Sequence, residues 1–230
     1  MPTPPDPTAS AADDAAALAH DLKAPLRVIA GFAQVLKEDH ATQLDAFGLG
    51  HVQRIEAAAQ RMGAMLDQWL ALSRLSLQAL EPGPVNLSAM AHDILGELQA
   101  QEPERACALH IQDGIEVQAD AQMMRRVMDN LLGNAWKYSR TQAHTTVTLR
   151  AERQPEGRVA VEVIDQGVGF DMQLVSALFQ PFQRLHSASD FPGHGVGLAA
   201  VKRMVERHGG RVWARGAPGQ GATFGFNLPQ

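Results

Sequence analysis

The sequence predicts class α + α/β, a helical hairpin followed by a mixed α/β domain. Apolar residues recur at helical spacing over 11–38 and 48–78. The turn-rich stretch LEPGPVN (80–86) then interrupts this pattern and marks a domain boundary. Beyond it, short segments of alternating apolar and polar residues are interleaved with helical segments, as in a sheet covered by helices. We therefore expect two structural units in this chain.

Each of the first two segments carries a heptad stripe. The stripe of the first comprises Leu22, Leu26, Ile29, Ala33 and Leu36, and that of the second comprises Val52, Ile55, Ala59, Met62, Leu66 and Trp69. With a connection at 38–50, the two helices form an antiparallel hairpin. A hairpin cannot bury its stripe alone. It pairs with a second copy as a four-helix bundle, or it packs on the rest of the same chain.

The second unit is expected to be a largely antiparallel sheet with helices on one face. Helices are predicted at 87–101, 120–138 and 196–208, and strands at 107–112, 115–118, 145–153 and 158–165, with a C-terminal hairpin from GRVWARG and GATFGFNLP. Asn86 or Ser88 is expected near the first cap, and Asp120 opens the next helix. The stretch 166–194 has no clear period and is interpreted as a long functional loop.

Composition narrows the function classes. The formal net charge of −5 argues against nucleic acid as a partner, because phosphate binding needs a basic surface. The single cysteine, Cys107, excludes an internal disulfide and is expected to be a small buried residue. No apolar run approaches the ~20 residues of a membrane span, and the Pro-rich start is unlike a signal peptide. We expect a cytoplasmic protein with a disordered leader at 1–12.

The stretch AHDLKAPL (19–26) places His20 beside Asp21 inside the first predicted helix. Pro25 has no N–H, so the carbonyl of Asp21 loses its helical partner and the helix should bend there. Taken alone, the stretch favours an ordinary solvated histidine.

A second motif is NLLGNAWKY (130–138). Asn130 and Asn134 lie four residues apart and share a helical face, with Lys137 close to the same side. Amide oxygens can ligate Mg²⁺, and a lysine supplies a point charge for phosphate. By itself this motif is more typical of a solvated helix face.

Glycine-rich motifs follow. In DQGVGF (165–170), Asp165 ends a strand where its carboxylate could accept the exocyclic amine of a purine, and Gly167 and Gly169 permit close backbone approach. GHGVGLA (193–199) precedes a helix, whose N-terminus attracts phosphate. Its G-x-G-x-G spacing without a preceding strand disfavours a nicotinamide cofactor. GQGATF (219–224) adds another glycine pair, typical of a hairpin turn.

The order of these motifs, with an F-x-P-F-x-R segment at 179–184, resembles the sensor histidine kinase family. HDLKAPL is similar to its H box, and the later motifs are similar to its N, G1, F, G2 and G3 boxes. The resemblance covers 18–228, and 182–214 looks most like the soluble, phytochrome-type members. It implies a dimerisation and phosphotransfer domain at 13–80, a linker at 81–86 and a catalytic domain at 87–230.

The resemblance implies a Bergerat-type ATP-binding α/β sandwich, the fold shared by gyrase, Hsp90, histidine kinases and MutL. Asp165 would contact adenine, while Asn130 and Asn134 would serve Mg²⁺ and the phosphates. The implied ATP-binding set is Asn130, Asn134, Lys137, Tyr138, Asp165, Gly167, Gly169, Gly193, Gly195, Gly197, Leu198 and Thr223. Phe179 and Phe182 would anchor a mobile ATP lid, or they pack in the core.

The resemblance also assigns His20 as the phosphoacceptor in a homodimeric bundle, with Asp21 orienting the ring and taking its proton. The phosphoryl group would pass to an Asp of a response regulator receiver domain, and a separate sensor protein would supply the signal. Ala24 stands where many members carry Thr or Asn to position water, which argues against phosphatase activity.

Two other functions remain open from the residues. An ATPase of the gyrase type would carry a Glu base where this chain has Asn130, and an amide cannot act as a base. A nucleotide-binding scaffold without catalysis would not need complete N, G1 and G2 boxes.

Overall fold

The computed structural model describes residues 7–75, 79–142, 145–155, 157–186, 191 and 195–229. Within these ranges only the backbone is described for 7–17, 20, 68–69, 71–75 and 145. The chain divides into two compact units, Met1–Gln78 and Ala79–Gln230. The units are described separately below.

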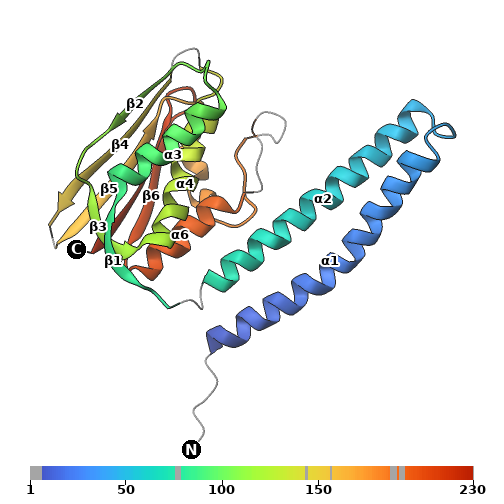
Figure 1. Ribbon diagram of the computed structural model, residues 1–230, viewed down its shortest axis with the longest axis horizontal. Coiled ribbons are helices and arrows are strands. Elements are labelled where there is room, and N and C mark those ends of the chain that lie inside the picture. The colour runs from blue at the N-terminus through green and yellow to red at the C-terminus, as the bar shows by residue number, and fades with distance from the viewer. Residues whose placement is uncertain are drawn as a thin grey trace, which may run out of the picture. The chain divides into compact units, whose positions relative to one another are not determined.

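The first unit is a hairpin of α1 (Pro7–Asp39) and α2 (Ala46–Leu75), drawn in blue and cyan in Figure 1. A disordered leader is expected at 1–12 from the sequence; residues 7–12 instead belong to α1, and residues 1–6 lie outside the described residues. Alanine has the highest helix propensity and dominates this stretch, and Pro7 suits a first helical turn. α1 also continues through Pro25 without a break in its helical assignment.

The heptad stripe divides into a buried and an exposed half. The buried half comprises Leu26, Ala33, Val52 and Ala59, and Ala19, one turn before the stripe, is buried as well. The exposed half comprises Leu22, Ile29, Leu36, Ile55 and Met62, which are 40–53% exposed. Ion pairs join the helices from Lys23 to Asp67 and from Lys37 to Glu56. The hairpin therefore buries one side of its stripe and leaves the other side open within the chain.

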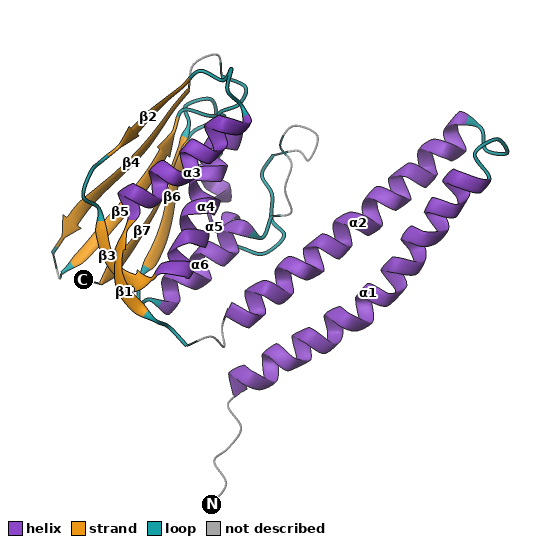
Figure 2. Ribbon diagram, viewed as in Figure 1, coloured by secondary structure: helices purple, strands orange, loops and turns teal. Residues whose placement is uncertain are grey.

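The second unit is an α/β sandwich, which confirms the predicted fold class. Its elements are β1 (Pro82–Asn86), α3 (Leu87–Gln101), β2 (Cys107–Ile111), β3 (Glu116–Asp120), α4 (Ala121–Tyr138), β4 (Thr145–Gln154), β5 (Arg158–Asp165), η1 (Met172–Leu174), α5 (Val175–Leu178), α6 (Gly197–Arg207), β6 (Arg211–Gly216) and β7 (Ala222–Pro229). The main sheet has the order β2-β4-β5-β7-β6 and is antiparallel except for the β2–β4 pair. Figure 2 shows α3, α4 and α6 on one face of it.

Two expectations about this unit are corrected. The stretch 81–86, expected as a linker, contains β1, which pairs antiparallel with β3 to form a separate two-stranded sheet. Its prolines and glycine are typical of a turn, but pairing with β3 overrides that local preference. Cys107 is half-buried rather than buried, because it begins β2, an edge strand of the main sheet.

The core lies between the helices and the sheet. The residues of α4 that it buries are Met123, Met124, Val127, Met128, Leu131, Leu132, Ala135 and Trp136. On the sheet side the core includes Val161 and Phe226, both fully buried. Side-chain caps fix two helix starts: Asn86 accepts from Ala89 N at 2.8 Å, and Asp120 accepts from Met123 N at 3.0 Å. In the described part of the chain, no helix is both long and apolar enough to cross a membrane.

Candidate functional site

The C-terminal half of α4 presents the predicted amide pair. The Asn130 side chain donates to Arg126 O at 2.7 Å, and a Cβ on Gly197 would overlap its Oδ1. The first residue of α6 therefore packs against Asn130, and a larger residue there would displace the Asn130 side chain. The Asn134 side chain makes no hydrogen bond to any residue in the described ranges. Its amide remains available to a ligand.

Asp165 is the buried carboxylate of the site. It ends β5 opposite Ala222 of β7, is 4% exposed, and accepts a hydrogen bond from Gly167 N at 2.8 Å. Burial raises the pKa of Asp165 to about 6, although the Gly167 and Ala222 N–H groups act in the opposite direction. At neutral pH this carboxylate is ionised, and a ligand donor would compensate its lost hydration.

Backbone segments around Asp165 pack so closely against two glycines that a side chain would not fit at either position. A Cβ on Gly167 would overlap Tyr138 O at the end of α4. Gly221 has φ +79°, and a Cβ there would overlap Asp165 O. Val168 N donates to Tyr138 O at 3.1 Å, so the loop after β5 is hydrogen-bonded to the end of α4. Backbone packing thus fixes Asp165 relative to α4.

Aromatic side chains gather beside this position. The Tyr138 ring lies 4.9 Å from Phe191 and 5.4 Å from His186, measured between ring centroids. His186 Nε2 is hydrogen-bonded to Gly169 O at 2.9 Å, and Arg184 donates to Phe191 O at 2.5 Å. These contacts link the segment before α6 to the loop that follows Asp165.

Lys137 supplies the positive charge. Its Nζ lies 4.1 Å from the centroid of the Tyr138 ring. Burial lowers the pKa of Lys137 to about 8, and the positive charge of Arg184 lowers it further. Lys137 is therefore still mostly protonated at pH 7 and can neutralise phosphate oxygens.

The end of α4 is held by a residue that the sequence analysis missed. Arg105, in the loop after α3, donates to Trp136 O at 2.6 Å and places its guanidinium 4.2 Å from the Trp136 ring centroid. Ser139 Oγ donates to Ala135 O at 2.5 Å. These bonds satisfy carbonyls that a helix end leaves without partners. Arg105 therefore supports the turn that carries Lys137 and Tyr138.

Most of the predicted site residues lie on these converging segments, with some qualifications. Leu198 follows Gly197 in α6, and Thr223 of β7 pairs with Ile164. Gly195 accepts from Phe182 N at 2.8 Å. Gly193 lies outside the described residues. Phe182 has φ 65° and is 44% exposed, which excludes it from the core, whereas Phe179 is half-buried at the end of α5.

The predicted phosphoacceptor lies in the other unit. His20 is in α1, but its side chain is outside the described residues, whereas Asp21 next to it is described as exposed. Within the described residues, no group of three or more His, Cys, Asp and Glu side chains could hold a metal ion.

Sequence comparison identifies both units. Residues 15–78 match the His Kinase A (phospho-acceptor) domain, and residues 119–230 match the histidine kinase-, DNA gyrase B-, and HSP90-like ATPase family. Cyanobacterial phytochrome A of Nostoc sp. is 31% identical over 210 residues, covering 91% of this chain and 27% of that protein. Sensor protein kinase PmrB of Pseudomonas aeruginosa is 33% identical over 217 residues, covering 92% and 44% respectively. The chain thus spans less than half of these relatives.

Structural comparison agrees. Full-length ShkA in complex with AMPPNP matches with a TM-score of 0.64 and 26% identity, covering 94% of this chain and 45% of that chain. The mycobacterial sensor histidine kinase MprB matches with a TM-score of 0.55 and 25% identity, covering 65% of this chain and 97% of that chain. With both domain types present in order, the chain belongs to the sensor histidine kinase family.

Proposed function

We propose that this chain is a protein-histidine kinase that phosphorylates His20 from ATP and passes the phosphoryl group to an aspartate of a response regulator receiver domain. The observation that carries the proposal is the Asp165 carboxylate, buried beside glycine-lined backbone and an Asn/Lys helix. The same chain carries a phospho-acceptor helix with His20 followed by Asp21.

The site residues fit ATP and Mg²⁺. The ionised carboxylate of Asp165 accepts from the adenine amine, as a charge-assisted hydrogen bond. Asn130 and Asn134 offer amide oxygens to Mg²⁺, which takes oxygen ligands together with phosphates. Mg²⁺ would neutralise the charge that develops on the phosphates. Lys137 and the N-terminus of α6 at Gly197 face the same negative charge. Tyr138, Gly167, Gly169, Gly193, Gly195, Leu198 and Thr223 complete the proposed set.

The chemistry at His20 is an in-line displacement. A neutral imidazole nitrogen attacks the γ-phosphorus, the bond to the β–γ bridging oxygen breaks, and ADP leaves with the electron pair. An unperturbed histidine pKa of about 6.5 supplies the neutral ring at pH 7. The displaced ring proton passes to Asp21, whose carboxylate also orients the ring. The receiver carboxylate later attacks the same phosphorus and releases neutral histidine after proton return.

A second copy of the chain supports the hairpin. The exposed half of the stripe repeats every seven residues, at Leu22, Ile29 and Leu36 in α1 and at Ile55 and Met62 in α2. Such a repeat matches the seam of a coiled coil or four-helix bundle. We place the partner copy against this seam, which gives a homodimer with two copies of His20.

Two features bear on competing activities. Asn130 stands at the helix position where an ATPase would need a general base, and its side-chain amide donates to Arg126 O. Ala24, one helical turn beyond His20, has no hydroxyl or amide to position water against a phosphorylated receiver. The proposal therefore excludes fast ATP hydrolysis and efficient phosphatase activity.

Incubation with γ-labelled ATP and Mg²⁺ tests this function. We expect label that is lost in acid and stable in base, and that is absent from His20→Ala. Asn134→Ala should remove the label while the dimer persists, which separates the ATP site from the bundle. Steady phosphate release without protein label would favour the ATPase, and nucleotide binding with neither outcome would favour a scaffold.

A further inference from the structure

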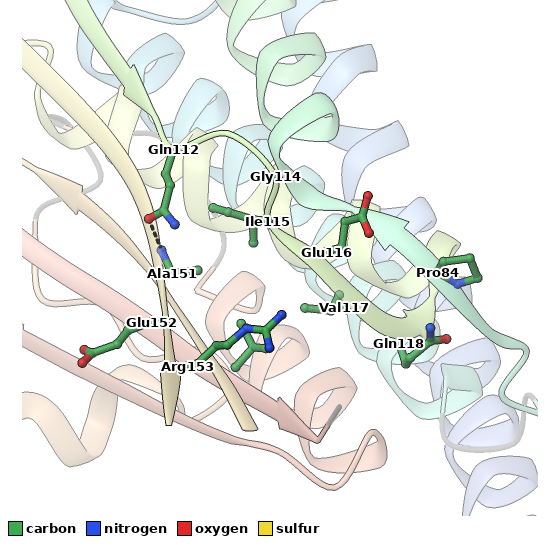
Figure 3. A pocket seen from close by; sticks show the side chains of 11 residues that line it. Pro84, Gln112, Gly114, Ile115, Glu116, Val117, Gln118, Ala151, Glu152 and Arg153 are labelled. Atoms are coloured by element: carbon green, nitrogen blue, oxygen red, sulfur yellow. Dashed lines mark hydrogen bonds between the residues drawn. The ribbon is translucent and has the colours of Figure 1, made fainter. Parts of the chain in front are cut away.

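A groove of about 410 Å³ opens between β3 and β4, at the opposite end of β5 from Asp165 (Figure 3). Residues of both strands and of the preceding loops line it. The lining includes Ile115, Val117, Gln118, Ala151, Arg153 and Val159. None of the proposed ATP-site residues lines the groove, so ATP binding does not account for it.

The β4 side of the groove is a free strand edge. β2 pairs with β4 only as far as Ile111 opposite Leu149. Beyond this point the Gln112 side chain, rather than the β2 backbone, bonds to β4: its Oε1 accepts from Ala151 N at 2.9 Å. The Ala151 N–H therefore points away from β5. Strand periodicity places the N–H and C=O of Arg153 on the same open edge.

The β3 side is also a free edge. Ile115 O accepts from Leu87 N at 2.8 Å, and Ile115 N donates to Ser88 Oγ at 2.9 Å, so the backbone of Ile115 faces the β1 side. The alternate residues Glu116 and Gln118 therefore direct their backbone groups away from β1. Backbone donors and acceptors of both strands thus border the groove.

The groove has an apolar floor and a positive group. Ile115, Val117 and Val159 are buried at its base. Figure 3 shows the Arg153 side chain reaching from β4 toward β3, whereas Glu116 and Glu152 point away from the space between the strands. Among the described residues, Arg153 forms no ion pair and no side-chain hydrogen bond. A charge in such a position is a natural anchor for an acidic group.

We propose that this groove binds an extended peptide segment of a partner protein, which adds as a strand to β4 and places an acidic side chain on Arg153. The free N–H and C=O groups of Arg153 supply the backbone pairing, as in other cases of strand addition. The apolar floor takes the neighbouring side chains on the same face of the peptide, two residues before and after the acidic one. Charge complementarity with Arg153 sets the register.

The probe is a blocked seven-residue peptide in which a central glutamate and two valines alternate with threonines. A matched peptide carries lysine in place of the glutamate. With the full chain, calorimetry should give at least about tenfold tighter binding of the glutamate peptide, since one favourable charge contact corresponds to about that factor. Amide hydrogen exchange should slow at Arg153.

Arg153→Glu should reverse the preference toward the lysine peptide, while Arg211→Glu on the opposite edge strand should leave it unchanged. His20 labelling by ATP should be the same in both variants, which keeps this test independent of the kinase assignment. Equal binding of the two peptides, or protection that maps outside β3 and β4, would overturn the proposal. Self-association of the chain that Arg153→Glu abolishes would also overturn it, because a second copy would then be the occupant.

Discussion

The hairpin and the α/β unit differ in how much of their apolar surface they bury on their own. α4 buries eight side chains against the sheet and its neighbouring helices. In contrast, alternate residues of the stripe are exposed from Leu22 to Leu36 in α1 and from Val52 to Met62 in α2. The α/β unit therefore has a complete core within one chain, whereas the hairpin leaves apolar surface exposed, which we propose that a second copy covers. The proposed nucleotide site is in the α/β unit, and the proposed nucleophile is in the hairpin.

The largest expected effect tests the complete core. Met128→Ala removes a fully buried side chain of α4 and should lower the free energy of unfolding of this unit by about 2–5 kcal/mol. Leu36→Ala, on the exposed half of the hairpin stripe, should cost less in a dilute sample. Chemical denaturation at several protein concentrations checks both, and the Met128→Ala loss should not depend on concentration. An equal loss for both variants would contradict the comparison.

Gly221→Ala should both weaken the fold and remove ATP binding. A Cβ at Gly221 would overlap Asp165 O and force a left-handed conformation on an alanine. Gly219→Ala is the matched control, because its φ is +73° but nothing lies within 4 Å of the new Cβ. The control should lose only about 1–2 kcal/mol of stability and retain nucleotide affinity in a fluorescent ATP-analogue titration. Retained affinity in Gly221→Ala would be incompatible with the proposed site.

Ile29→Lys tests the dependence of the hairpin on a partner. A lysine on the exposed seam must desolvate its charge in a bundle, so the dimer dissociation constant should rise by about tenfold or more. Val28→Lys changes the neighbouring residue, which is also exposed but lies off the heptad repeat. Sedimentation at micromolar concentration should show this control as a dimer. A dimer unaffected by Ile29→Lys would place the interface elsewhere.

The affinity for ATP should depend on pH through Asp165. Its folded pKa is raised to about 6 from an ordinary value of 3.8, so the ionised acceptor is lost as pH falls through about 6. Binding should weaken about tenfold between pH 7 and pH 5. Without nucleotide, the free energy of unfolding should change with pH in the opposite direction. It should rise as pH falls from above 6 toward 4.

Asp165→Asn is the control for this pH dependence. It should bind ATP weakly at every pH and show only the titration of the nucleotide itself. Calorimetry should compare the ATP affinity of Asp165→Asn and of the unmodified protein across this pH range. If the two affinities fall in parallel, Asp165 does not govern the pH dependence.

The smallest expected effect concerns Arg105. Arg105→Met removes the bond to Trp136 O and should raise the KM for ATP several-fold with little change in kcat, because the end of α4 shifts while the chemistry remains intact. Arg105→Lys should recover part of the loss. Arg140→Met removes only the pairing with Glu102 and should leave KM unchanged. If Arg105→Met lowers the free energy of unfolding but leaves KM unchanged, the role of Arg105 is structural only.

The sequence predicted the elements with local signals and missed contacts that arise only in the fold. Helix and strand periodicity placed α3, β4 and β5 within one residue, because these patterns are local. β1 escaped because its pairing partner β3 lies about thirty residues later and its own composition is typical of a turn. Periodicity also could not separate the buried from the exposed half of the heptad stripe.

The candidate site shows the same division. Ordered motifs pointed to Asn130, Asn134, Lys137 and Asp165 as proposed site residues, because their spacing is visible in the sequence. Arg105, His186 and Phe191 belong to no motif, since their contacts with α4 and the loop after β5 come from tertiary packing. An arginine in a short loop gives no signal of the helix end that it supports.

Mass-spectrometric localisation of the phosphoryl group, after incubation of the full chain with ATP and Mg²⁺, tests the central claim most directly. The account predicts one phosphoryl group per chain in the fragment AHDLKAPL, on His20, and none when Asp165→Asn is incubated in the same way. A phosphoryl group on any other residue, or an unmodified chain that still binds ATP, would contradict the assignment of this protein as a histidine kinase.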